Sequence, residues 1–149
     1  MRIAKQLSRS GATEESIQQL EAKLGSRLPE DYRRFLTDLN GGRPDPSSFV
    51  FETKAGLNDS AVRYFLTLDS GEIRYTIPNY LNTYKDRIPK GVLPIGCDSF
   101  GNLVLLDVCS KSPGSVYFWD HEEESMNERT WQNISIVAPS FKAFEEALE

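Results

Sequence analysis

The spacing of apolar residues before position 40 predicts two helices. In the first helix, apolar residues recur at intervals of three and four along one face: Ile17, Leu20 and Leu24. Thr13 is placed to cap this helix and Gly25 to end it, because a threonine oxygen accepts from free N–H groups and glycine adopts left-handed backbone readily. The second helix begins in LPEDYRRFL (28–36), with proline and two acids in its first turn, and ends at NGG (40–42).

The pattern changes after position 45. Two stretches rich in β-branched and aromatic residues predict strands at 47–52 and 61–69. A helical spacing then returns in four residues that share one face: Ile77, Leu81, Tyr84 and Ile88. Thr76 is the expected cap of this helix, and Pro89 is its expected end because proline cannot continue a helix.

Three apolar stretches follow at short intervals, at 92–97, 102–108 and 115–120. Their connections are short and rich in Gly, Pro, Asp and Ser, which favours antiparallel hairpins over crossovers. A last strand at 133–138 precedes a helix capped by Ser140. The predicted fold class is α+β, with a mostly antiparallel sheet of about five to six strands packed with N-terminal, central and C-terminal helices.

The stretch GCDSFGN (96–102) lies between two of these strands and is predicted to form the turn of a hairpin. With residues 98–101 as the loop, the hairpin has three expected cross-strand pairs: Cys97 with Asn102, Ile95 with Val104, and Leu93 with Leu106. Aspartate and glycine suit such a loop, because it needs a local side-chain acceptor and positive φ angles.

The same stretch raises the alternative of a hydrolase or a metal-dependent enzyme built on Cys97, Asp98, Ser99 or His121. A nucleophile elbow requires G-x-S-x-G, and Cys97 stands where the first glycine should be. His121 lies among acids but has no second His or Cys nearby to complete a metal site. We therefore favour a structural turn and a solvated acidic loop, and expect no catalytic residue, no metal and no cofactor.

The length of 149 residues suits one domain spanning 1–149, with residues 1–12 expected to be loosely ordered. Seventeen basic and 22 acidic side chains give a formal net charge of -5, which argues against nucleic acid as a partner and fits a partner protein that is neutral or basic. The N-terminal stretch lacks the apolar core of a signal peptide, and no stretch approaches a membrane span. We expect a cytoplasmic protein with no membrane partner.

Three blocks of the sequence, taken together, resemble the SUKH superfamily, which has the Smi/Knr-type domain. They are LPEDYRRFLTDLNGG (28–42), VLPIGCDSFGNLVLLDV (92–108) and GSVYFWDHEEE (114–124). The likeness is strongest to the bacterial toxin-immunity members. It implies an α+β fold without catalytic apparatus, and a small cytosolic protein that binds and neutralises a cognate toxin. Eukaryotic members act as interaction modules in regulation.

The resemblance, the acidic balance and the missing catalytic motifs lead to one expected function. It is a non-enzymatic immunity protein that binds and occludes a cognate bacterial toxin, a basic nuclease being one candidate. The alternative is a regulatory or scaffolding module that binds an endogenous protein. The candidate partner-binding residues are Asp98, Ser99, Phe100, Asp120, Glu122, Glu123, Glu124 and Trp131. The acids are equally explained as solubilising residues and Trp131 as a cap on the core, and self-association is left open.

Overall fold

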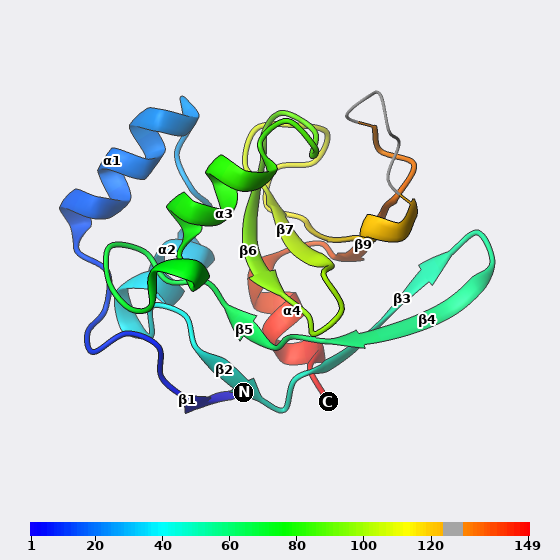
Figure 1. Cartoon of the computed structure of the whole chain (residues 1–149), viewed down its shortest axis with the longest axis horizontal. Coiled ribbons are helices and arrows are strands. Elements are labelled where there is room, and N and C mark those ends of the chain that lie inside the picture. Colours follow the sequence, from blue (N-terminus) through cyan, green and yellow to red (C-terminus); the bar gives the residue numbers. More distant parts are fainter. Residues whose placement is uncertain (124–129) are drawn as a thin grey trace.

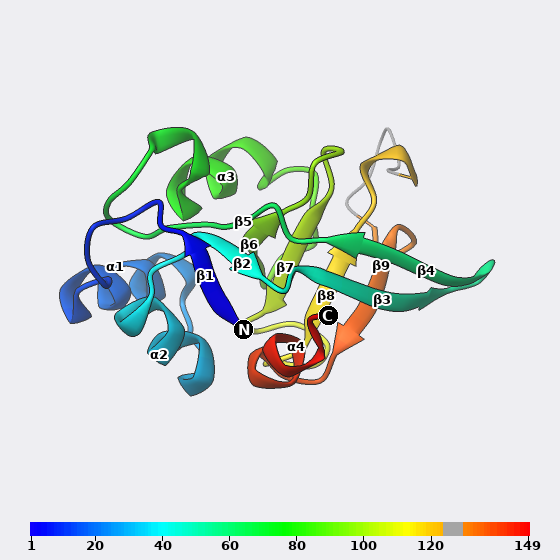
Figure 2. The same ribbon diagram turned by 90° about the horizontal axis from the view of Figure 1, so that it is seen from below.

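The computed structural model describes residues 1–123 and 130–149, and it confirms the predicted α+β class. The main sheet has five antiparallel strands in the order β5-β6-β7-β8-β9 (Figures 1 and 2). Their bounds are β5 (Tyr64–Phe65), β6 (Val92–Cys97), β7 (Leu103–Asp107), β8 (Val116–Trp119) and β9 (Ile134–Ala138). Strands β6, β7 and β8 are buried along their whole length, as a central strand with both faces covered requires.

Helices cover both faces of this sheet (Figure 2). Helix α3 (Ile77–Tyr84) lies on one face, where Tyr84 packs edge-to-face on Trp119 with ring centroids 5.7 Å apart. Helices α2 (Glu30–Asp38) and α4 (Phe141–Ala147) lie on the other face, and Phe35 and Phe141 meet there at 4.9 Å. The aromatic rings therefore form the core on both sides of the central strands.

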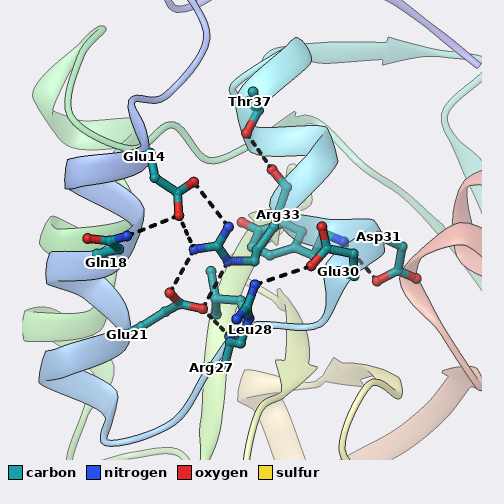
Figure 3. A network of polar contacts seen from close by, with 10 residues as sticks. Glu14, Gln18, Glu21, Arg27, Leu28, Glu30, Asp31, Arg33 and Thr37 are labelled. Carbon is teal, nitrogen blue, oxygen red and sulfur yellow. Dashed lines mark hydrogen bonds and ion pairs between the residues drawn. The ribbon is translucent and has the colours of Figure 1, made fainter.

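Helix α1 (Glu14–Leu24) begins and ends as predicted, with Thr13 accepting from the Ser16 N–H and Gly25 left-handed at φ 71°. It is joined to α2 by Arg33, whose guanidinium forms two hydrogen bonds to Glu14 and two to Glu21 (Figure 3). The Arg33 and Glu21 side chains are 9% and 13% exposed, so this ion pair lies largely beneath the surface, whereas Glu14 is 59% exposed.

Strands β3 (Ser48–Thr53) and β4 (Gly56–Ala61) form a hairpin, which we call the arm. The arm crosses the end strands of the sheet and projects past them (Figures 1 and 2). Phe49 and Phe51 fasten its inner face to the sheet, since both rings pack on Phe118 at 5.9 and 4.6 Å. The outer face carries apolar side chains in the open, Leu57 being 77% exposed.

The N-terminal third differs from expectation at two places. Residues 1–12 were expected to be loosely ordered, but Arg2–Lys5 form β1, which pairs with β2 (Arg43–Asp45). The stretch 61–69 was expected to be one strand, but the chain changes partner within it. Ala61 ends β4 in the arm, and only Tyr64–Phe65 join the main sheet, beside β6.

The register predicted for the β6–β7 hairpin is correct at the end far from the turn and off by one residue near the turn. Leu93 faces Leu106 as predicted, but Gly96 faces Val104 and Cys97 faces Leu103. A bulge at Ile95 causes the shift, because one extra residue on a strand moves every later pair by one. Helix α3 also ends earlier than predicted, at Tyr84, with one further turn before Pro89 in which Arg87 and Ile88 donate to the Tyr84 carbonyl.

Candidate partner-binding site

Two adjoining hollows lie between the arm and the loops at the end of the main sheet. The arm hollow, of about 410 Å³, runs along β4 and is lined chiefly by Asn58, Asp59, Ser60, Phe100, Asp120 and Glu122. The tip hollow, of about 660 Å³, lies at the arm's tip and includes Lys54, Glu123, Trp131 and Gln132. Asn58 and Asp120 line both, so the two hollows form one continuous surface.

The turn after β6 is organised by Asp98. One carboxylate oxygen accepts from the N–H groups of Phe100 and Asn102, at 2.8 and 2.9 Å. The other accepts from the Asn102 amide at 2.8 Å and from the hydroxyl of Ser60, on the arm, at 3.1 Å. With four donors and 6% exposure, this carboxylate holds the turn and the arm in place. Asp98 was a candidate contact residue, and its geometry is that of a positioning residue.

Phe100 is the large apolar side chain that the turn presents to solvent, with 76% of its surface exposed. Ser99 beside it is also exposed but does not line either hollow. A large aromatic side chain held in the open by a rigid turn is suited to contact a partner.

His121 joins the acidic loop to this turn. Its ring Nε2 lies 2.7 Å from the Phe100 carbonyl oxygen, and its backbone N–H donates to the Asn102 side-chain oxygen at 3.0 Å. The ring packs over Gly101, where a Cβ atom would lie 3.1 Å from Nε2. This contact was not predicted from the sequence, because it joins segments about twenty residues apart and depends on the missing side chain of Gly101.

The predicted acidic residues gather on the same side of the molecule. Glu122 and Glu123 are exposed in the short helix η2 (His121–Glu123), and Asp120 caps it by accepting from the Glu122 N–H at 2.9 Å. Asn133 holds this segment through two hydrogen bonds to the backbone of Asp120, both 3.0 Å long. Glu124 lies outside the described residues. No lysine or arginine is among the residues that line the arm hollow.

Trp131 is half-buried. Its position is compatible with both roles considered for it, a cap on the core and a contact residue for a partner. Its ring packs edge-to-face on Tyr117 at 5.3 Å, and Lys111 places its Nζ 4.4 Å from the ring centroid. The ring also lines the tip hollow. Tyr117 in turn donates to Asp107 at 2.7 Å, and burial raises the pKa of its hydroxyl well above the ordinary value.

The alternative of an enzyme built on the turn finds no support in this geometry. The Cys97 thiol is buried, and burial raises its pKa, so the thiol stays protonated at neutral pH. Asp98 is occupied by the turn, and the His121 ring faces a backbone carbonyl. Within residues 1–123 and 130–149, no three side chains of His, Cys, Asp or Glu are grouped as a metal site would require.

Four residues of the surface lie on β4, a strand that sequence reasoning missed: Asn58, Asp59, Ser60 and Ala61. The stretch GLNDSA lacks the alternation of a half-buried strand because most of its side chains face water. The available signal for a turn was Gly56, which follows the predicted strand at 47–52 and has a positive φ of 115°.

Comparison with known proteins agrees with this architecture. The family model of the SMI1 / KNR4 family (SUKH-1) matches residues 11–147. The chain belongs to the SUKH-1 family. A relative of this SUKH-1 chain by sequence is the SPbeta prophage-derived uncharacterized protein YokK of Bacillus subtilis (strain 168). It is 23% identical over 145 residues, covering 89% of this chain and 72% of that protein. No helix among the described residues of this SUKH-1 chain has the length and apolar character to cross a membrane.

Proposed function

We propose that this SUKH-1 protein is a non-enzymatic immunity protein that binds a cognate, basic bacterial toxin in the cytoplasm and occludes its active groove. The observation that carries the proposal is the convergence of exposed acids and Phe100 around the arm hollow. A nuclease needs a basic groove to hold phosphates, and an acidic protein surface is attracted to such a groove and can fill it.

Family membership and the prophage origin of the relative support this proposal over a housekeeping role. Asp59 lies on the arm, whereas Asp120 and Glu122 lie in the segment of η2, and the contacts of Asp98 and His121 with the turn hold both segments at fixed positions. A preorganised surface loses little conformational freedom on binding. The arm adds reach, since it projects past the sheet into the space a partner would occupy.

The test is co-expression with the toxin domain encoded beside this gene. The wild-type chain is expected to restore growth and to co-purify with the toxin domain as a stable complex. Lysine substitution at Asp59, Glu122 and Glu123 is expected to abolish both effects. The matched control carries lysine at Asp38, Asp86 and Glu146, which changes net charge equally but leaves the two hollows intact.

Loss of protection in the first variant and not in the control would support binding through the arm hollow. Equal protection by both variants would contradict the proposed surface. If the wild-type chain neither protects nor forms a complex, the immunity function itself is wrong, and the regulatory or scaffolding alternative takes its place.

A further inference from the structure

Strand β4 has a free edge that faces the arm hollow. It pairs with β3 along six residues without a bulge, and no other strand lies beside it among the described residues. Backbone hydrogen bonds alternate in direction along an antiparallel strand. Because Val62 donates to Ser47, and Ser48 exchanges both its bonds with Glu149, the N–H groups of Leu57, Asp59 and Ala61 point away from β3.

The hollow lies along this edge and not along one face of the strand. Four consecutive residues, 58–61, line it, although successive side chains of a strand point to opposite faces. The outward N–H of Asp59 is engaged only locally, by the side chain of Asn58 at 2.9 Å. An incoming carbonyl oxygen can replace that local acceptor.

Among the described strands, the edges of β1, β3 and β9 are protected, and that of β4 is not. At β1 the edge carries Arg2 and Lys5 and an irregular register, which discourage further pairing. The outer edge of β3 is met by the C-terminal Glu149, and β9 has β3 packed against it. Strand β4 has neither lysine, arginine nor proline, and its side chains are mostly exposed. Such an edge is a template for an added strand.

We infer that β4 is extended by a strand of the toxin, which adds to the arm as a third strand and lies in the arm hollow. This inference rests on the proposed immunity function. Charge selects the occupant: Asp120 and Glu122 border the hollow beneath the inner face of β4, so the added strand carries basic side chains on its inner face. Its outer face lies beside Leu57, which is 77% exposed, and beside Asp59, which shares the face of Leu57 and Val50 because it pairs with Val50. That face therefore combines apolar side chains with a basic one opposite Asp59.

A second copy of this chain fits the edge poorly. Two β4 strands paired around a twofold axis would bring two arm hollows together, each bordered by carboxylates and neither lined by lysine or arginine. Like charges across a pair of strands destabilise it. The edge therefore favours a basic heterologous strand over self-association.

The test uses the full chain in complex with the inactivated toxin domain encoded beside its gene. Amide hydrogen exchange at Leu57, Asp59 and Ala61 is expected to slow at least tenfold in the complex. Exchange at Gly56, Asn58 and Ser60, whose N–H groups face β3, is expected to change little. A complex that forms without protecting the outward amides overturns the inference and leaves the proposed function standing.

Two substitutions at one position separate strand addition from charge attraction. Asp59→Asn removes the charge and keeps the N–H, whereas Asp59→Pro removes both, and neither removes a hydrogen bond to β3. We expect the proline variant to bind the toxin domain at least tenfold more weakly than the asparagine variant. Equal affinities would overturn strand addition, as would a free chain that sediments as a dimer with the outward amides already protected. If no complex forms with the wild-type chain, the proposed function fails instead.

Discussion

Arg33 is predicted to be the residue whose loss most weakens the contact between α1 and α2. Replacing it with methionine keeps much of the apolar stem but leaves Glu14 and Glu21 without their cation. The Glu14 side chain is 59% exposed and will be hydrated, whereas that of Glu21 is 13% exposed and keeps only the Leu28 N–H as a donor, at 2.7 Å. Stranding a largely buried carboxylate costs roughly 2–3 kcal/mol of the free energy of unfolding.

Equilibrium unfolding in urea at pH 7, followed by tryptophan fluorescence, measures this loss. The double variant Arg33→Met with Glu21→Gln should recover part of it, because a neutral amide needs no counter-charge and still accepts from Leu28. Arg34→Met, on the exposed face of the same helix, is the control and should cost less than about 0.5 kcal/mol. A loss in Arg33→Met as small as that of the control, or no recovery in the double variant, would refute the reasoning.

The Arg33 network also predicts how the stability of the fold depends on pH. Hydrogen bonds from Arg33 lower the pKa values of Glu14 and Glu21 below the ordinary value of 4.5. A carboxyl with a lowered folded-state pKa stabilises the fold above its unfolded pKa, and this contribution disappears as pH falls through the folded pKa. The difference in stability between wild type and Arg33→Met should therefore be constant near neutrality and shrink below about pH 4.5. A difference unchanged at pH 3 would contradict the assignment.

Three further substitutions test how the surface is held. Asp98→Ala leaves the donors of the turn without their shared acceptor and should cost about 2 kcal/mol in urea unfolding; a cost near zero would show that water replaces the carboxylate. Phe51→Ala removes the ring stacked on Phe118, should cost about 3 kcal/mol or more, and should speed tryptic cleavage of the arm before global unfolding; unchanged cleavage would mean that the arm is held by other contacts. Gly101→Ala forces a Cβ to within 3.1 Å of His121 at a φ of +90° and should cost about 1–2 kcal/mol; a matched Gly25→Ala, also left-handed but with open space around it, should cost less.

The parts of the fold that were predicted correctly are those fixed by local rules. Helix α1 begins and ends as predicted because Thr13 and Gly25 satisfy backbone groups within their own turn. The base of the β6–β7 hairpin was right because Leu93 and Leu106 are apolar residues at the correct distance from a turn. The bulge at Ile95 was missed, since an entirely buried strand has no alternation to reveal a one-residue shift.

The candidate site was only partly predicted, because some of its residues lie where the sequence has no periodic pattern. Phe100, Asp120 and Glu122 stood out as exposed chemistry next to predicted strands, and the structure places them around one hollow. The arm supplies the opposite wall, but β4 is polar and solvated, so no periodicity marks it. Asp98 was interpreted as surface, because a single sequence cannot show that its carboxylate accepts from a residue 38 positions away, Ser60.

Each of the three segments that surround the arm hollow is held in place by side chains that lie beneath the exposed surface. Phe49 and Phe51 hold the arm, Asp98 holds the turn, and Asn133 holds η2. The side chains that meet solvent above these anchors take little part in building the sheet. A lineage can therefore replace the exposed residues of one segment while the other two stay in place. Each such step would redirect recognition toward a changed partner without the chain first losing its ability to fold.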